Sequence, residues 1–316
     1  KAVKEICDSL EKKPSVVMIC ITCVDALLGT DMERVCRKAE EAAGLPVRPC
    51  YMYALTREGR KPPMVHVRQS LYSLLEPRKK KGNVVNLLGF FSPLVDDCEL
   101  YDLLHQAGVK TIHETSACRD YEEYQTMSEA NFNLVLHPEA RFAAEDFHDR
   151  LKIPFIELTR LYQIDKIGSQ YRAFGKVLGV TFDDQAAAES AQKAVDAFRV
   201  QYPEASFAVG ECMNGDAFEL SLALVRYGFK VPEIYGTITA ENFIYIKQLA
   251  AISPETRVYS NMEPTMLYYD GENSGVNMAI GKDAAYYHQN CPNVMWNQDR
   301  QPYGYAGVRR LFEALT

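Results

Sequence analysis

Short apolar runs alternate with longer amphipathic stretches along most of the chain. Residues 16–22 read Val-Val-Met-Ile-Cys-Ile-Thr, which is typical of a strand that is buried on both faces. Residues 31–43 then carry spaced apolar positions among charges, which predicts a helix that ends near Gly44. The same order of strand and helix is predicted at residues 83–89 and 99–107, 133–136 and 140–151, and 206–212 and 217–227.

Further elements extend this pattern to the end of the chain. Two long helices are predicted at residues 164–178 and 186–202, and Pro46 and Pro154 each stand at the entrance to a strand. Other predicted elements are strands at 109–112, 231–235, 257–260, 277–280 and 294–296 and a last helix at 307–315. Repeated strand–helix pairs predict parallel sheets covered by helices, and so many strands predict several doubly wound α/β domains.

Composition narrows the class of protein without naming a function. The 316 residues are 47% hydrophobic and 24% charged, which excludes global disorder and fibrous architectures. Thirty-five basic against 42 acidic residues give a net charge of −7, so we expect no nucleic-acid partner. The longest apolar run, residues 16–24, is too short to span a bilayer. With no targeting segment at the start, we expect a cytoplasmic protein that does not bind membranes.

Cysteine is the residue type that most suggests chemistry. Nine scattered cysteines do not resemble a secreted disulfide framework, so we expect reduced thiols, at least one of which binds metal. Cys20 and Cys23 form a Cys-Ile-Thr-Cys segment at the end of the first predicted strand, a spacing used by zinc sites, iron–sulfur clusters and dithiols. We predict that Cys23 is the functional thiol and that Cys20 packs in the core.

Two other candidate residues follow predicted strands. Ligands of doubly wound folds bind outside the carboxyl ends of the strands; His137 directly follows the predicted strand at 133–136, and Cys212 ends the one at 206–212. We therefore predict that both side chains bind a cofactor. The sequence has neither GxxxxGK[ST] nor a GxGxxG after a strand, and no GxSxG elbow. If ATP is used, we expect another protein to bind it.

Four ordered segments resemble nitrogenase component 1. Residues 21–31 (Ile-Thr-Cys-Val-Asp-Ala-Leu-Leu-Gly-Thr-Asp) are similar to that family's Thr-Thr-Cys segment, which ends in Gly-Asp-Asp. Residues 86–89 (Asn-Leu-Leu-Gly) resemble the opening of its second domain, and Asn-Leu-Val at 133–135 followed by Ile-Pro at 153–154 resembles a later strand. Residues 301–307 (Gln-Pro-Tyr-Gly-Tyr-Ala-Gly) resemble the entrance to its C-terminal helix. The family includes nitrogenase subunits, cofactor-assembly scaffolds and dark-operative tetrapyrrole reductases.

The resemblance implies three Rossmann-like α/β domains with parallel sheets. It places an incomplete first domain at residues 1–82, a second at 83–180 and a third at 181–316, whose last helix returns to the first. It also implies an iron–sulfur ATPase reductase as electron donor and a homo- or heterodimer with another component 1-like subunit. The family cysteine at the position of Cys23 ligates an iron–sulfur cluster between subunits. The other cluster cysteines lie upstream in the family, so we expect an incomplete ligand set here.

Two departures from the family pattern change the function that we expect. His137 stands where nitrogenase has the cysteine that holds its cofactor, and residues 293–299 contain no histidine to match the second cofactor ligand. We therefore expect no dinitrogen fixation. The resemblance instead implies ATP-coupled, iron–sulfur-mediated reduction of a bound substrate, such as a tetrapyrrole, or assembly of a metal cofactor.

Two alternatives stay open at this point. A chain of this kind could be a non-catalytic binding module for a metal chelate or a tetrapyrrole. It could also be a thiol redox protein that uses Cys20 and Cys23. Whether the chain is an enzyme is therefore undecided by the sequence, and an oxidoreductase subunit is the favoured interpretation.

Overall fold

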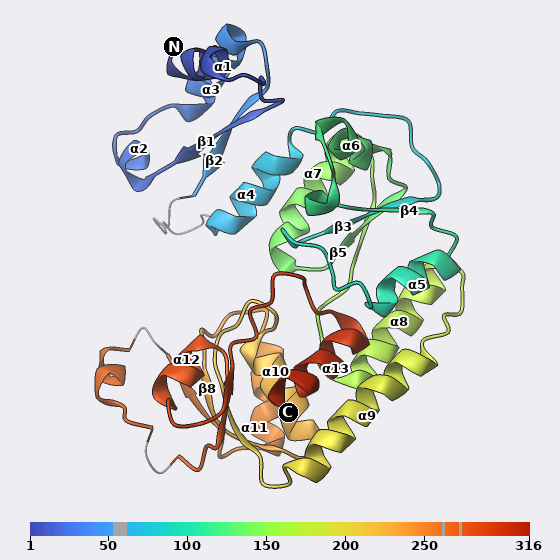
Figure 1. Ribbon diagram of the computed structural model, residues 1–316, viewed down its shortest axis with the longest axis vertical. Helices are drawn as coiled ribbons and strands as arrows, with labels where there is room; N and C mark the ends of the chain where they lie inside the picture. The colour runs from blue at the N-terminus through green and yellow to red at the C-terminus, as the bar shows by residue number, and fades with distance from the viewer. Residues whose placement is uncertain (53–61, 261–262, 272–273) are drawn as a thin grey trace. The chain divides into compact units, whose positions relative to one another are not determined.

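The computed structural model describes residues 1–52, 62–260, 263–271 and 274–316, which form two compact units (Figure 1). The first unit comprises residues 1–91 and 109–159, and the second comprises residues 92–108 and 160–316. The strands form three sheets with the orders β1-β2, β4-β3-β5-β6 and β11-β10-β7-β8-β9, and every strand pair between them is parallel. The predicted class, α/β with parallel sheets, is confirmed.

The first sheet of unit one is small. In it, β1 and β2 pair with Cys20 opposite Cys50. Gly44 ends α3 in the left-handed conformation, at φ 68°, as the helix pattern predicts. The elements of this part are α1 (Ala2–Ser9), β1 (Val17–Ile21), α2 (Cys23–Leu27), α3 (Met32–Ala43), β2 (Val47–Tyr51) and α4 (Pro63–Tyr72).

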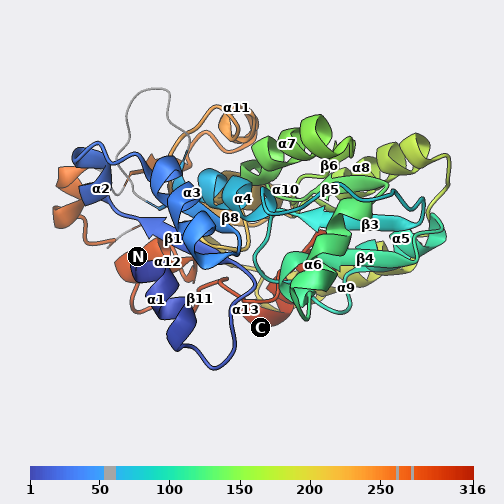
Figure 2. The same ribbon diagram turned by 90° about the horizontal axis from the view of Figure 1, so that it is seen from above.

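The second sheet of unit one is buried in its centre. Every residue of β3 and β5 is buried, which is why both segments are so apolar. Helix α7 lies along this sheet (Figure 2), and its Phe147 packs edge-on against Tyr72 of α4, with ring centroids 5.1 Å apart. The elements are β3 (Val84–Leu88), β4 (Thr111–Glu114), α6 (Tyr121–Gln125), β5 (Phe132–Val135), α7 (Arg141–Leu151) and β6 (Phe155–Glu157).

The second unit is a five-stranded sheet with helices packed on it. Phe198, Phe207, Phe229 and Phe312 form an aromatic core in which neighbouring ring centroids lie 5.4 to 6.1 Å apart. Its helices are α5 (Glu99–Gln106), α8 (Ile164–Leu178), α9 (Gln185–Gln201), α10 (Ala217–Arg226), α11 (Phe243–Ile252), α12 (Lys282–Tyr287) and α13 (Gly304–Leu315). Its strands are β7 (Ser206–Val209), β8 (Lys230–Tyr235), β9 (Arg257–Tyr259), β10 (Met278–Ile280) and β11 (Asn293–Val294).

The sequence pattern did not predict helices α2, α4, α6, α11 and α12. Helix α11 is apolar over most of its length, so it shows little helical period. Helix α4 begins at Pro63 and has an arginine on its buried face, which interrupts the expected apolar stripe. The predicted domains 1–82, 83–180 and 181–316 each contain one of the three sheets, and their boundaries stay a prediction.

A buried glutamate fixes the start of the C-terminal helix in unit two. Glu99 of α5 accepts hydrogen bonds from the backbone N–H groups of Tyr305 (2.6 Å) and Ala306 (3.0 Å) and from the hydroxyl of Tyr171 (2.7 Å). The first N–H groups of a helix have no partner within the helix, and a carboxylate there also suits the helix dipole. Gly304 precedes these residues at φ 58°, and a Cβ atom there would lie 1.9 Å from Glu99 Oε1.

We predict that Gly304→Ala destabilises the protein far more than a positive φ alone explains. The matched control is Gly228→Ala, since Gly228 has φ 92° but nothing within 4 Å of an added Cβ. The control should cost about 1–2 kcal/mol of unfolding free energy, and Gly304→Ala at least about 3 kcal/mol. Urea unfolding followed by circular dichroism measures both. Equal losses in the two variants would contradict the proposed role of Glu99.

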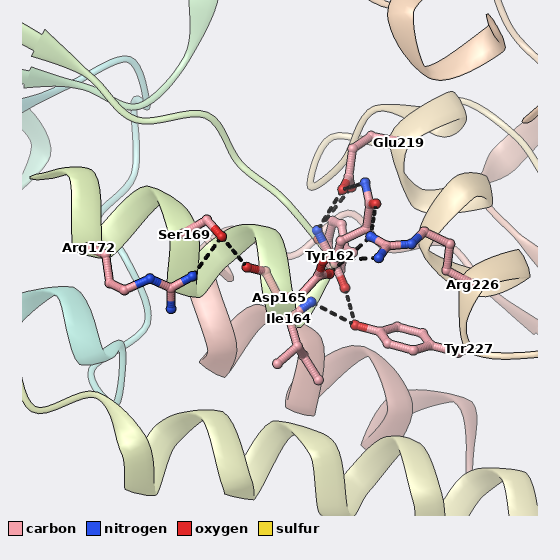
Figure 3. Close-up of polar contacts among 9 residues, drawn as sticks. Tyr162, Ile164, Asp165, Ser169, Arg172, Glu219, Arg226 and Tyr227 are labelled. Atoms are coloured by element: carbon pink, nitrogen blue, oxygen red, sulfur yellow. Dashed lines mark hydrogen bonds and ion pairs between the residues drawn. The ribbon is translucent and has the colours of Figure 1, made fainter. Parts of the chain in front are cut away.

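A second buried glutamate, Glu219 of α10, holds the segment that leads into α8 (Figure 3). Its two carboxylate oxygens accept from the backbone N–H of Tyr162 (3.1 and 3.0 Å), and Oε1 also accepts from Gln163 Nε2 (3.0 Å). Tyr227 donates its hydroxyl to the Tyr162 carbonyl and accepts from the backbone N–H of Ile164 (3.1 Å). Burial raises the pKa of Glu219 to about 7, although its hydrogen-bond donors oppose that shift.

We predict that Glu219 makes the stability depend on pH. Because its folded pKa of about 7 exceeds the usual 4.5, the folded state binds the proton more tightly than the unfolded state. The stabilisation is therefore complete below about pH 4.5 and is lost as the pH rises through about 7, a change of roughly 3 kcal/mol. Urea unfolding between pH 5 and 8 should show this loss in the wild type and not in Glu219→Gln.

Glu204→Gln is the control for this titration, because the Glu204 side chain is 86% exposed. It should keep the pH dependence of the wild type. A Glu219→Gln variant with the same pH dependence as the wild type would contradict the prediction.

Candidate functional site

The carboxyl ends of β3 and β5 bring two backbone segments of unit one into close contact. Gly89 follows β3 at φ 131°, and a Cβ atom there would lie 2.7 Å from the backbone nitrogen of His137. Only glycine permits this approach. His137, which follows β5 after Leu136, is thereby held beside the end of β3, at the sheet edge that its position in the sequence predicts.

Short-range contacts orient the His137 ring. Its Nδ1 accepts a hydrogen bond from the backbone N–H of Glu139 (3.3 Å) and lies 3.7 Å from Glu139 Oε2. The ring also meets Phe90 edge-on, with centroids 5.8 Å apart. The side chain remains 36% exposed, so it can reach a ligand. Its role as a cofactor-binding residue stays a prediction.

Arg68 is a functional candidate that sequence reasoning missed. It lies on α4 with its side chain almost fully buried, and it donates to the Gly89 carbonyl (2.9 Å) and to Glu139 Oε2 (2.7 Å). The guanidinium also stands 4.5 Å above the Phe91 ring. Burial lowers the pKa of Arg68, and the charge of Glu139 opposes this. The arginine thus ties both strand ends to α4.

A sequence signal for Arg68 exists in retrospect. Val65, Arg68 and Tyr72 are spaced three and four residues apart and are the buried residues of α4. An arginine on the buried face of a helix needs a carboxylate and carbonyl partners, which marks it as a residue with a specific role.

Cys23 is the first residue of α2 and is exposed. Thr22 caps this helix together with Asp25, whose carboxylate accepts from the Thr22 backbone N–H (3.2 Å). Three apolar side chains of the same segment are exposed as well, Val24 at 61%, Leu27 at 74% and Leu28 at 75%. We call Val24, Leu27 and Leu28 the α2 apolar patch.

The expectation that Cys20 packs in the core is wrong, because its side chain is exposed. The prediction that this strand is buried on both faces is also wrong, because Ile21 is the one residue of β1 that is fully buried. The thiol of Cys50, opposite Cys20 on β2, is buried instead. Burial, with a smaller contribution from Cys20, raises the pKa of Cys50 to about 11.

The fit of this chain to an iron–sulfur cluster is partial. Cys23 supplies an accessible thiol at a capped helix start, which suits a cluster ligand. Within residues 1–52, 62–260, 263–271 and 274–316, however, no three histidine, cysteine, aspartate or glutamate side chains converge on a possible metal position. A cluster bound at Cys23 therefore needs further ligands beyond that part of the chain.

Cys212 lies after β7 in unit two, in a turn that holds its thiol. The Sγ atom donates to the Gly215 carbonyl (3.6 Å). Burial raises the pKa of Cys212 to about 12, although the nearby Arg160 guanidinium opposes the shift. Without a bound cation, the thiol is therefore protonated at neutral pH. The cofactor role of Cys212 stays a prediction.

The turn that carries Cys212 is fixed by polar side chains. Asn214 Nδ2 donates to Gln301 Oε1 (3.1 Å), which also accepts from Arg160 Nη2 (2.8 Å). Trp296, at φ 50°, donates its indole N–H to the Tyr162 hydroxyl (2.6 Å), and that hydroxyl donates to the Asn214 carbonyl. These hydrogen bonds join the turn after β7 to the segment after β11.

In the part of the chain that the structure describes, none of the helices combines the length and apolarity that a transmembrane span requires.

Curated relatives match about half of this chain. A nitrogenase iron-molybdenum cofactor biosynthesis protein NifE from Rhizobium meliloti (strain 1021) is 28% identical over 161 residues, which cover 50% of this chain and 33% of the relative. The protein of the same name from Nostoc sp. (strain PCC 7120 / SAG 25.82 / UTEX 2576) is 26% identical over 170 residues, 52% of this chain and 35% of the relative. The match thus spans about a third of the length of these relatives.

Solved structures share the fold over more of the chain. A structure titled "Nitrogenase Cp1 at pH 6.5" superposes with a TM-score of 0.75 at 18% identity, covering 99% of this chain and 77% of the other. A second, titled "Nitrogenase Cp1 at pH 5", gives a TM-score of 0.65 at 16% identity and covers 95% and 70%. These similarities show that the chain has the fold of those proteins.

The family model described as "Nitrogenase component 1 type Oxidoreductase" matches residues 1–316. The match covers all four segments whose sequences carried the resemblance. The chain therefore belongs to the nitrogenase component 1 type oxidoreductase family.

Proposed function

We propose that this chain is a component 1-type subunit that acts in metal-cofactor assembly or in ATP-coupled, iron–sulfur-mediated reduction of a bound substrate, and not in dinitrogen fixation. Cofactor assembly is the favoured branch, since the curated relatives carry the name of a cofactor biosynthesis protein. The observation that carries the proposal is the exposed thiol of Cys23 beside the α2 apolar patch.

An exposed thiol next to exposed leucines suits a ligand that a second subunit covers. Apolar side chains that are 61% to 75% exposed leave most of their apolar surface in water. Burying that surface against a second protein would stabilise the complex. A partner that packs on the α2 apolar patch would also enclose Cys23 and could supply further cluster ligands. We therefore assign this surface to a homo- or heterodimer with another component 1-like subunit.

His137 and Arg68 define the second part of the proposed site. The imidazole of His137 is intermediate between hard and soft metal ligands, whereas a cysteine at this position would supply a soft thiolate. A metal chelate, a tetrapyrrole or a cluster under assembly fits such a ligand. Arg68 would act as a positioning residue, because it fixes Gly89 and Glu139 on either side of the histidine.

Electrons and ATP hydrolysis would come from a separate iron–sulfur ATPase reductase. This assignment rests on the family, together with the absence of a nucleotide-binding glycine motif from the sequence. A bound cluster would supply electron transfer, and this chain's own contribution would be the Cys23 thiol and the His137 imidazole. Reduced thiols of this kind fit a cytoplasmic location.

The cluster assignment predicts that Cys23→Ser lowers retained iron by about tenfold or more in full-length protein purified without oxygen. Iron analysis and EPR spectroscopy measure the cluster. Cys20→Ser is the matched control, since that thiol is also exposed and lies three residues away. It should keep the wild-type iron content.

Two outcomes would change this assignment. Equal iron loss in both variants would favour a shared Cys20–Cys23 site, and unchanged iron in Cys23→Ser would remove Cys23 as a ligand. Tight uptake of a tetrapyrrole without reductant-dependent turnover would favour the non-catalytic binding module.

The interface assignment predicts that Leu27→Glu/Leu28→Glu abolishes the dimer, because each introduced carboxylate would lose its hydration on burial. Sedimentation velocity measures the association state. Val200→Glu on α9 is the control, since Val200 is also strongly exposed but lies outside the α2 apolar patch. A double variant that still dimerises like the wild type would overturn the assignment.

A further inference from the structure

A buried carboxylate in unit two is surrounded by three side chains that can all bind a metal ion. Glu233 Oε2 lies 2.7 Å from the Tyr235 hydroxyl and 2.7 Å from His288 Nε2. Those two donors are 3.2 Å from each other, and Glu233 Oε1 accepts from the Tyr269 hydroxyl. We call Glu233, Tyr235, Tyr269 and His288 the Glu233 cluster.

The tertiary structure assembles this cluster from three separate segments. Glu233 and Tyr235 are two residues apart on β8, Tyr269 follows the short helix at Pro264–Tyr268, and His288 ends α12. Gly271, at φ 68°, lets its segment pass close to the imidazole, since a Cβ atom there would lie 3.1 Å from His288 Cε1. Neither Cys23, His137 nor Cys212 belongs to this cluster.

The cluster is buried, yet one of its members lines an opening. Glu233, Tyr235 and His288 are each less than 7% exposed. Tyr269 lines a cavity of about 440 Å³ together with Tyr259, Ser260 and Glu263. An ion that enters this cavity would therefore meet Tyr269 on its way to Glu233.

We propose that the Glu233 cluster binds one ferric ion. Donor atoms about 2.0–2.1 Å from one metal ion lie about 2.8–3.4 Å from their neighbours in octahedral or tetrahedral geometry. The separations of 2.7, 2.7 and 3.2 Å among Glu233 Oε2, His288 Nε2 and the Tyr235 hydroxyl are close to those of one face of such a site. Tyr269 adds a fourth donor at the other carboxylate oxygen.

Charge balance favours a trivalent ion. One carboxylate and two phenolates carry three negative charges, and neutral His288 adds none, so a ferric ion would make the buried site neutral. Binding would break the two phenolic O–H bonds and release both protons to solvent, with no change in the oxidation state of iron. His288 would bind through Nε2, and the proton of that nitrogen would move to Nδ1 of the neutral ring, so the two phenolic protons are the only ones released. Three oxygen donors and one imidazole, without a thiolate, suit this hard ion.

Hydrogen bonds among the four side chains also satisfy their polar groups without a metal ion. Burial raises the pKa of Tyr235 and of Tyr269, and Glu233 raises both further through hydrogen bonding. Without a metal ion both phenols therefore stay protonated and donate to the carboxylate. A bound cation would reverse this preference, as metal ions do for their ligands.

The proposal predicts that purified protein takes up one equivalent of iron from ferric nitrilotriacetate. Uptake should produce the visible charge-transfer absorption of iron-bound tyrosinate and release two protons per ion, which a pH-stat measures. Tyr235→Phe and Tyr269→Phe should each weaken binding at least about tenfold, and the double variant should lose the absorption. Both changes keep the aromatic ring, so the packing around it is preserved.

Tyr268→Phe is the matched control, because Tyr268 neighbours Tyr269 but is 88% exposed. It should bind iron like the wild type. Difference spectra against the double variant remove any absorption from an iron–sulfur cluster, so this test is independent of Cys23. Absence of the stoichiometric band, its survival in the double variant, or uptake of zinc without iron would each overturn the ferric assignment.

Discussion

Burial of parallel strands on both faces is the constraint on which the rest of this structure depends. Because helices cover a parallel sheet, a strand interior has room for few polar side chains, and polar chemistry moves to the carboxyl ends of the strands. Gly89, His137 and Cys212 all lie at such ends. A polar residue that is buried all the same, in a strand or in a helix packed on a sheet, depends on a specific partner.

Three buried glutamates of the second unit satisfy that requirement in different ways. Glu99 accepts from the first backbone N–H groups of α13, so it joins α5 to the C-terminal helix. Glu219 accepts from the backbone of the segment before α8, and burial raises its pKa to about 7. Glu233 is surrounded by side chains that can exchange their protons for a metal ion. The first two glutamates stabilise the fold through hydrogen bonds to the backbone, and the third belongs to the proposed ferric site.

The cysteines show how one sequence signal leads to two environments. Cys23 and Cys212 both lie at the end of a strand, and the sequence predicts cofactor binding for both and metal ligation for Cys23 alone. Cys23 begins a short, exposed helix, whereas Cys212 lies in a turn held by Asn214 and Arg160, where its thiol remains protonated. The α2 apolar patch beside Cys23 and the buried Arg68 beside His137 depend on tertiary context in the same way.

The sequence by itself determined the α/β class, the parallel sheets and most elements to within about two residues, because strand burial and helix amphipathicity are local patterns. It also placed His137 at the edge of a sheet, since the carboxyl end of a strand is a position in the chain. Only the tertiary structure decided that Cys20 is exposed and that Arg68 is buried. It alone brought Glu233, Tyr269 and His288 together. Exposure and the meeting of distant residues depend on how sheets and helices pack, and no local pattern in the chain encodes that packing.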